Sequence, residues 1–200
     1  MENGMFQVGK LMVLGLVTPL GTSATAANAI ANSVAAMVNV PGNAVSLSLI
    51  TVVGQCMGTG DSRQAVGYTR KLMTIVYLSM GALSLSLFFA AGPVVSFFGL
   101  TPAAARMAVE VIRWYSVVTA VLWPMSFVMP NALRAAGDAR FTMIVSMFSM
   151  WVFRVGFSYL LVPYIGLLGV WIAMFIDWVL RAAVFLFRFL RGRWKTKTVI

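Results

Sequence analysis

The chain has 200 residues, of which 60% are hydrophobic and 10% are charged. Soluble domains average about 45–50% apolar and about 25% charged residues, so this composition excludes an ordinary water-soluble domain and indicates a protein of the lipid bilayer. The formal net charge is +10, but the basic residues lie between and after hydrophobic segments rather than on one solvated face, which argues against nucleic-acid binding.

Six apolar segments follow one another along the chain. They cover residues 5–21, 26–57, 66–91, 105–130, 141–163 and 168–188. A transmembrane helix needs about 20 mostly apolar residues, so each segment is close to or above the required length. We therefore predict an all-α, polytopic membrane protein: a six-transmembrane-helix bundle over residues 1–190, followed by a basic cytoplasmic tail at residues 191–200.

The first two segments differ in length. The first begins almost at Met1 and would span about 26 Å, just under the hydrocarbon thickness of about 30 Å, which is compatible with missing sequence upstream. No cleavable signal pattern precedes it, because Met1-Glu2-Asn3-Gly4 lacks a basic region. The second segment is long, and Pro41-Gly42 in its middle predicts a kink that a membrane helix tolerates when its neighbours satisfy the freed carbonyl.

The distribution of basic residues predicts the orientation. Ten Lys and Arg residues flank the second and fourth connections or lie in the tail: Arg63, Arg70, Lys71, Arg134, Arg140, Arg188, Arg191, Arg193, Lys195 and Lys197. The alternate connections hold only Arg106 and, less closely, Arg113. Because cytoplasmic loops carry the Lys and Arg excess, we expect both termini and the even connections to face the cytoplasm, in the plasma membrane.

A polar stripe follows the second helix. Asn28, Asn32, Asn39, Asn43 and Ser46 fall within an arc of roughly 60° on a helix. Lipid offers no hydrogen bonds, so such a stripe must face a partner helix or water. Two interpretations stay open: hydrogen bonds between helices, or a hydrated substrate cavity lined by the four asparagines.

Charged residues also fall deep in the last two segments. Asp177 and Arg181 are four residues apart on the sixth, and Arg154 lies in the fifth. Counted from their cytoplasmic ends, Arg154 is about 21 Å deep and Asp177 about 16 Å, a gap that an arginine side chain spans. An unpaired charge there costs at least about 2.5–3.5 kcal/mol. We therefore predict an intramembrane pair of Asp177 with one or both arginines, a structural brace in preference to a transport role.

Three other charged residues lie nearer to the predicted helix ends. Lys10 is near enough to the cytoplasmic end of the first helix to extend its ammonium group to the interface. Glu110 and Arg113, near the start of the fourth helix, are expected to form a surface pair.

The sequence does not favour an enzyme. Cys56 is the single cysteine and there is no histidine, so no internal disulfide is possible, and neither a zinc nor an iron site is expected. The run Gly58-Thr59-Gly60-Asp61 matches the GxGD motif of intramembrane aspartyl proteases. That chemistry needs a second aspartate facing the first, whereas Asp61 falls at a cytoplasmic helix end, where it can cap the next helix after a left-handed glycine. Gly137-Asp138 repeats the same turn pattern.

Several stretches together resemble the C-terminal half of the multidrug and toxic compound extrusion (MATE) exporters. Similar to the family's eighth helix and its exit are Ala26-Ala27-Asn28-Ala29-Ile30-Ala31-Asn32, Pro41-Gly42, Val53-Gly54-Gln55 and Gly58-Thr59-Gly60-Asp61. Similar to the turn after its tenth helix is Leu133-Arg134-Ala135-Ala136-Gly137-Asp138-Ala139-Arg140. Similar to the end of its second lobe are Met150-Trp151-Val152-Phe153-Arg154, Gly169-Val170-Trp171 and Asp177-Trp178.

This resemblance implies half of a cation-coupled antiporter that exports drugs or metabolites, often cationic or amphipathic, in exchange for H+ or Na+, with no other cofactor. Family members have two six-helix lobes across a central cleft, so a missing N-terminal lobe or a second chain is the implied partner. Glu2 corresponds loosely to the family's cation-linked acid on the seventh helix. Leu122-Trp123-Pro124 stands where some members have another acid. Two alternatives stay open: a non-transporting six-helix fragment and a homodimeric export subunit.

Overall fold

The structure, a computed structural model, describes residues 2–196 and the side chains of residues 4–194. All secondary structure in this range is helical. The elements are α1 (Glu2–Val17), η1 (Thr18–Leu20), α2 (Thr22–Val38), α3 (Val40–Gly58), α4 (Ser62–Ser96), α5 (Pro102–Trp123), η2 (Pro124–Val128), α6 (Met129–Ala135), α7 (Ala139–Phe148), η3 (Ser149–Gly156), α8 (Phe157–Ile165), α9 (Leu167–Leu190) and η4 (Arg193–Thr196). Of the four short segments, η1 and η4 are 3₁₀ helices, and η2 and η3 are π-helical.

These elements form the predicted transmembrane bundle. Five stretches are long and apolar enough to cross a membrane: Val40–Gly58, Ser62–Ser96, Pro102–Ala135, Ala139–Ile165 and Leu167–Leu190. Gly4–Leu20 is a shorter apolar helix that corresponds to the first predicted segment. The all-α fold class and the polytopic membrane bundle are therefore confirmed.

The second predicted segment is divided into two helices at Asn39, which separates α2 from α3. The cause lies two residues further on, because Pro41 has no N–H to donate to the carbonyl of Met37 and its ring crowds that carbonyl. The break falls inside the predicted polar stripe, so asparagines before and after Asn39 are carried by different helices.

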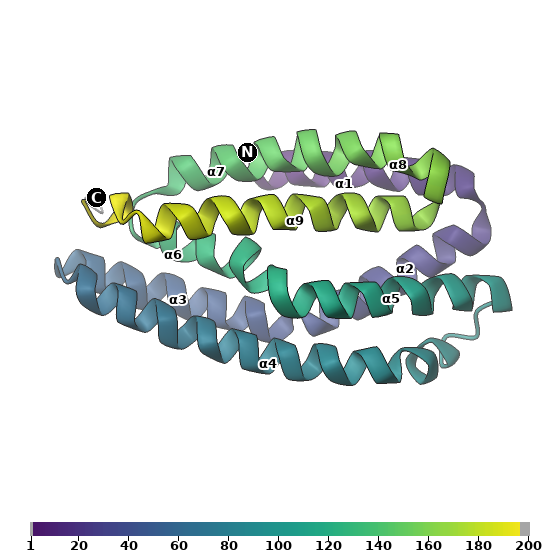
Figure 1. Ribbon diagram of the computed structural model, residues 1–200, viewed down its shortest axis with the longest axis horizontal. Coiled ribbons are helices and arrows are strands. Elements are labelled where there is room, and N and C mark those ends of the chain that lie inside the picture. The colour runs from purple at the N-terminus through teal and green to yellow at the C-terminus, as the bar shows by residue number, and fades with distance from the viewer. Residues whose placement is uncertain (1, 197–200) are drawn as a thin grey trace.

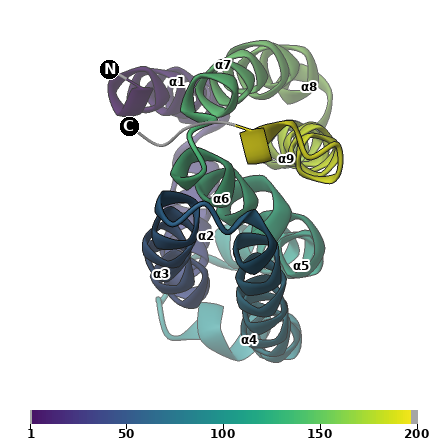
Figure 2. The same ribbon diagram turned by 90° about the vertical axis from the view of Figure 1, so that its left-hand side faces the viewer.

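The helices run along the long axis of the molecule, and the chain reverses direction at each of the connections between crossings, with α2 and α3 following one another in one direction and α7 and α8 in the other (Figure 1). The α3–α4 and α6–α7 connections and the end of α9 lie at one end, on the left in Figure 1, and the α1–α2, α4–α5 and α8–α9 connections lie at the other. Figure 2, turned by 90°, shows α1, α7, α8 and α9 grouped on one side and α2 to α6 on the other. Helix α9 packs against both α8 and α5 and so joins the two groups.

The two Gly-Asp turns lie at the left-hand end and differ in their side-chain chemistry. Gly60 and Gly137 both have positive φ, 77° and 86°, as expected for glycines that close a helix. Asp61 then caps α4 by accepting a hydrogen bond from the backbone N–H of Gln64 at 2.9 Å, which confirms its predicted role. Capping by the Asp138 side chain was wrong, since that carboxylate instead accepts two hydrogen bonds from Arg188, at 2.7 and 3.1 Å. This pair ties the end of α9 to the α6–α7 turn.

Two glycines lie where helices pack closely. A Cβ on Gly42 would lie 2.2 Å from the Cζ3 atom of Trp123, so only glycine lets α3 approach α5 at this point. A Cβ on Gly169 would lie 2.8 Å from backbone atoms of Leu161 and Val162, so α8 and α9 are in backbone contact there.

Candidate functional site

Two cavities meet inside the bundle, and Lys10 and Arg154 line both of them. The larger cavity has a volume of about 430 Å³, and its polar lining consists of Gln7, Lys10, Asn43, Ser46, Ser126, Asn131, Arg134, Ser146, Arg154 and Arg181. The smaller cavity has a volume of about 220 Å³, and its lining is Lys10, Val13, Leu14, Asn28, Asn32, Arg154, Val170, Trp171 and Met174. Polar groups in membrane-spanning helices are rare and mark functional positions, so these two cavities are the candidate site.

The predicted asparagine stripe is divided between the cavities and the helix contacts. Asn28 and Asn32 line the smaller cavity and Asn43 lines the larger, whereas Asn39 lines neither. The Asn28 carboxamide oxygen also accepts hydrogen bonds from Trp171 Nε1 at 3.2 Å and from Asn32 Nδ2 at 3.1 Å. The Asn39 carboxamide oxygen accepts one from the Tyr115 hydroxyl at 2.8 Å. Both interpretations of the stripe therefore have support, at different asparagines.

The three predicted intramembrane charges form one ion pair and one separate arginine. Arg181 Nε lies 2.8 Å from Asp177 Oδ1, and the side chains of both residues are almost fully buried. The Ser149 hydroxyl also donates to Asp177, and Arg181 donates to the backbone carbonyl of Ser146 at 3.0 Å. Arg154 makes no ion pair with a carboxylate of the described side chains, and its buried Nε has no hydrogen-bond partner among them. The brace thus joins α9 to α7 and η3 without Arg154.

Aromatic rings hold the Arg181 guanidinium from two further elements. Its Cζ lies 5.1 Å from the ring centroid of Phe6 on α1 and 5.5 Å from that of Phe127 on η2. Cation–π contacts of this length are attractive, most strongly where water is excluded. Arg181 is therefore a fixed part of the cavity wall, with its charge balanced by Asp177.

The two π-helical segments carry side chains into the larger cavity: Ser126 and Phe127 from η2, and Arg154 from η3. In η2 the backbone N–H of Met129 bonds to the carbonyl of Pro124, five residues earlier. Pro124 explains this widening, since it cannot continue the normal bonding of α5. Such segments are frequent at functional sites, where the extra residue redirects side chains.

The sequence profile of the MatE family matches residues 1–160. The chain belongs to the MatE family. It is 27% identical to the probable multidrug resistance protein NorM of Thermotoga maritima, covering 100% of this chain and 43% of that protein. It is 21% identical to the probable multidrug resistance protein YoeA of Bacillus subtilis, covering 84% of this chain and 36% of that protein.

Solved structures show the same fold as this MatE chain. An outward-facing multidrug resistance MATE family transporter of the MOP superfamily matches with a TM-score of 0.86 at 20% identity, over 98% of this chain and 45% of the other. A Pyrococcus furiosus MOP superfamily transporter, described as having a binding pocket of reverse polarity, matches with a TM-score of 0.85 at 20% identity, again over 98% and 45%. The MatE chain spans less than half the length of these relatives, so the predicted resemblance to half of a MATE transporter is confirmed. The relatives are transporters, which fits a protein that is not an enzyme.

The structure tests the sequence prediction for one of two charged residues of α1, Lys10, and not that for the other, Glu2. Lys10 is exposed on the cavity side of α1, close enough to Arg154 for their charges to interact. The sequence interpretation placed its ammonium group at the membrane interface, although a lysine in the middle of an apolar segment is itself a signal of function. Glu2 begins α1, but its side chain lies outside the described part, so its role in ion coupling stays a prediction.

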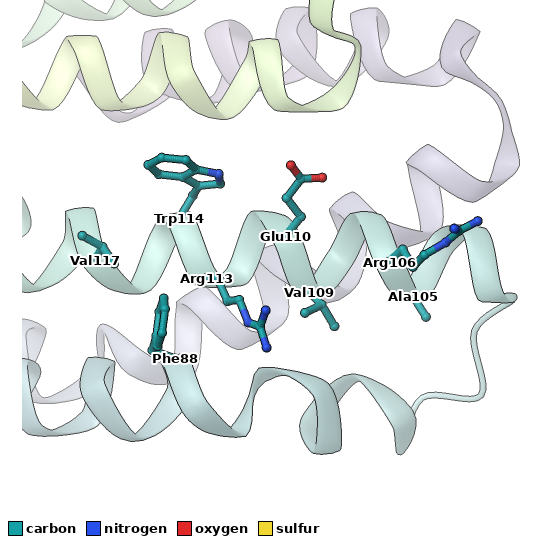
Figure 3. Close-up of a pocket in the computed structure, with 8 residues that line it drawn as sticks. All are labelled: Phe88, Ala105, Arg106, Val109, Glu110, Arg113, Trp114 and Val117. Carbon is teal, nitrogen blue, oxygen red and sulfur yellow. The ribbon is translucent and has the colours of Figure 1, made fainter.

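A third cavity lies on the outside of the MatE bundle, between α4 and α5. Its volume is about 590 Å³, and it is lined by Phe88, Ala105, Arg106, Val109, Glu110, Arg113, Trp114 and Val117 (Figure 3). Glu110 and Arg113 point to different sides of α5 and form no ion pair, so the predicted surface pair was wrong. Arg113 instead lies 5.9 Å from the ring centroid of Phe88. This wall is mostly apolar and suits lipid contact better than substrate binding.

Proposed function

We propose that this chain is the C-terminal lobe of a plasma-membrane exporter of drugs or metabolites, driven by exchange with H+ or Na+. The observation that supports the proposal is a polar cavity of about 430 Å³ inside a MatE-type lobe. Pockets for small molecules typically have volumes of about 300–1,000 Å³. Substrate binds between this lobe and a partner, which is either a first lobe or a second chain.

Movement of the lobe as one unit follows from its internal braces. Hydrogen bonds from Arg181 to the Ser146 carbonyl and from Ser149 to Asp177 fix α9 to α7 and η3, and the ion pair between Asp138 and Arg188 fixes the end of α9 to the α6–α7 turn. Transporters built from repeats change access largely by rigid rocking of one repeat against the other. In this proposal α7 to α9 move together and α1 to α3 line the face turned toward the partner.

Ion coupling and orientation complete the proposal. The described lining of both inner cavities contains no carboxylate, so Glu2 is the acid of this chain that we assign to H+ or Na+ binding. The end of the molecule that carries the α3–α4 and α6–α7 connections faces the cytoplasm, because Arg63, Arg140 and Arg191 gather there.

Export assays with and without a partner lobe test this function. The chain is produced in cells that lack their own efflux pumps, alone or fused after a six-helix MatE first lobe, and export of ethidium, chloramphenicol and fluorescein is followed. Export by the fusion alone is the expected result. Export by the 200-residue chain alone would support a homodimer. No export of any of the three compounds by a fusion of normal abundance would contradict the proposal and favour a non-transporting fragment. Collapsing the H+ and Na+ gradients separately identifies the coupling ion.

A further inference from the structure

We propose that the larger cavity binds a small organic anion, and that Lys10 and Arg154 hold its carboxylate or phosphate group. This assignment names the substrate class of the cavity and therefore rests on the proposed function. It differs from the cationic or amphipathic compounds that the family resemblance implies.

The first support for an anion is the balance of charge around the cavity. Two of the three lining arginines have partners: Arg181 is paired with the fully buried carboxylate of Asp177, and Arg134 donates a hydrogen bond to the Thr142 hydroxyl at 3.1 Å and has a further interaction. Lys10 and Arg154 have no carboxylate partner among the described side chains. The wall therefore keeps the positive charges of Lys10 and Arg154 without a carboxylate partner in the described part of the chain, and both residues line both cavities. A cationic ligand would be repelled by these two charges.

The second support is the unmet hydrogen bonding of Arg154. Its Nε is buried and has no partner among the described residues. A buried polar group without a partner costs about 1–3 kcal/mol, and more when it is charged. A bound carboxylate or phosphate would accept from the planar guanidinium and remove this penalty, which is the geometry for which arginine is best suited. The ammonium group of Lys10, on the opposing helix α1, would supply the second contact.

The remaining lining indicates an organic ligand rather than a simple inorganic ion. Gln7, Asn43 and Asn131 offer carboxamide groups, and the rings of Phe6 and Phe127 both contact Arg181. A volume of about 430 Å³ is several times what one anionic group fills and lies within the range of small-molecule sites. The fitting chemistry is one anionic group attached to a compact, partly apolar body. That chemistry occurs both in free metabolites and in anionic lipid headgroups.

A binding experiment with three compounds of equal size isolates the effect of charge. Benzoate, benzamide and benzylamine are titrated into the chain in phosphatidylcholine nanodiscs. The fluorescence of Trp171, which lines the smaller cavity, reports binding, and the variant Trp171→Phe shows how much of the fluorescence change comes from this residue. Benzoate should bind at least about tenfold more tightly than benzamide, because one charge-assisted hydrogen bond contributes enough free energy for a tenfold change in Kd. Lys10→Gln and Arg154→Gln should each weaken benzoate binding by about tenfold or more. Arg106→Gln, exposed on α5 and outside both inner cavities, should leave it unchanged.

Clear outcomes would overturn the proposal. These are benzamide or benzylamine binding as tightly as benzoate, no benzoate binding by folded protein, or unchanged binding in Lys10→Gln. Lys10 is exposed, so this variant tests the site even if Arg154→Gln fails to fold. Adding phosphatidylglycerol to the nanodiscs separates the two sources of anion. If the lipid competes with benzoate, the site exists and its occupant is a lipid headgroup. If the lipid does not compete, the site exists and its occupant is a free anion.

The result is separable from that of the export assays. A chain that binds benzoate but exports nothing when fused to a first lobe would reject the proposed function and keep the anion site. A fusion that exports ethidium while its cavity does not distinguish benzoate from benzamide would reject the anion site and keep the proposed function.

Discussion

Replacing Asp177 with asparagine tests the brace at the centre of the lobe. The change preserves the shape of the side chain and removes its charge, so Arg181 keeps the carbonyl of Ser146 and the rings of Phe6 and Phe127 but loses its counter-charge. The hydrogen bond from Ser149 can persist, because an amide oxygen still accepts.

The burial of the pair sets the size of the effect. The Asp177 side chain is 0% exposed and that of Arg181 is 3% exposed, so water cannot solvate the remaining charge. Removing one partner of a buried ion pair typically costs about 3–5 kcal/mol, and the contacts that Arg181 retains place our expectation at the lower end, about 3 kcal/mol. Asp177→Asn together with Arg181→Gln should recover at least about 1 kcal/mol, because no unpaired charge is then left at this point.

Thermal unfolding in detergent and the amount of folded protein in the membrane are the measurements. A double-mutant cycle should give a larger coupling energy between Asp177 and Arg181 than between Asp177 and Arg154, since only the former pair is in direct contact. Unchanged stability of Asp177→Asn would refute the brace. If export is also abolished while stability stays normal, Asp177 belongs to the coupling machinery instead.

Three further predictions follow from the fold. Gly169→Ala should destabilise the protein by about 1–3 kcal/mol in thermal unfolding, because the new Cβ would lie 2.8 Å from backbone atoms of Leu161. Arg188→Gln should lower stability by about 1–3 kcal/mol in the same assay, because it removes both hydrogen bonds to the carboxylate of the α6–α7 turn. A cysteine at Ser62 should be labelled by impermeant thiol reagents from the cytoplasm, and one at Thr101 from outside, because the two residues lie at opposite ends of α4 and its following turn.

Matched changes control each of these tests. Gly54→Ala adds a methyl group where nothing lies within 4 Å, so it should be harmless; equal damage from both glycine changes would contradict the close contact of α8 and α9. Arg191→Gln removes a similar charge three residues after Arg188, and an equal loss from both would show that net charge, not the pair, stabilises this end. Labelling of both cysteines from the same face would rule out the six-helix arrangement.

The helices were predictable because a bilayer restricts the composition of the segments that cross it. Backbone groups in lipid must be satisfied within the helix, so each crossing appears in the sequence as a long apolar run bounded by glycine, proline or aspartate. The division of the second run at Asn39 also follows from the sequence, since Pro41 removes a specific backbone hydrogen bond. The different roles of Asp61 and Asp138 do not, because the same Gly-Asp pattern opens both turns and only tertiary packing brings Arg188 to the second.

The candidate site was only partly predictable. The sequence gives the depth of a residue along its helix, but not always the direction in which its side chain leaves the helix. The four-residue spacing of Asp177 and Arg181 places them on one face of α9, and the pair forms as this spacing predicts. Arg154 was placed at a depth similar to that of Asp177, but counting along an ideal helix does not give its direction once the helix widens. The π-helical segment η3 contains no proline, so the sequence gives no sign of its widening. In η2, by contrast, Pro124 indicates it. Arg154 consequently lines both cavities, as Lys10 does.

The charges on the cavity side of the bundle therefore divide into two kinds. Asp177 and Arg181 are paired, desolvated and held by several elements, so changing their ionisation or position would require breaking the contacts of α9. Lys10 and Arg154 lie on α1 and η3 and form no ion pair with a carboxylate of the described residues, so an anion that enters the cavity would change their electrostatic energy. A ligand can shift the balance between two states of a transporter only through interactions that differ between those states. In the proposed export cycle the unpaired charges can provide that difference, because movement of the whole lobe against its partner changes how well an anion in the larger cavity is held.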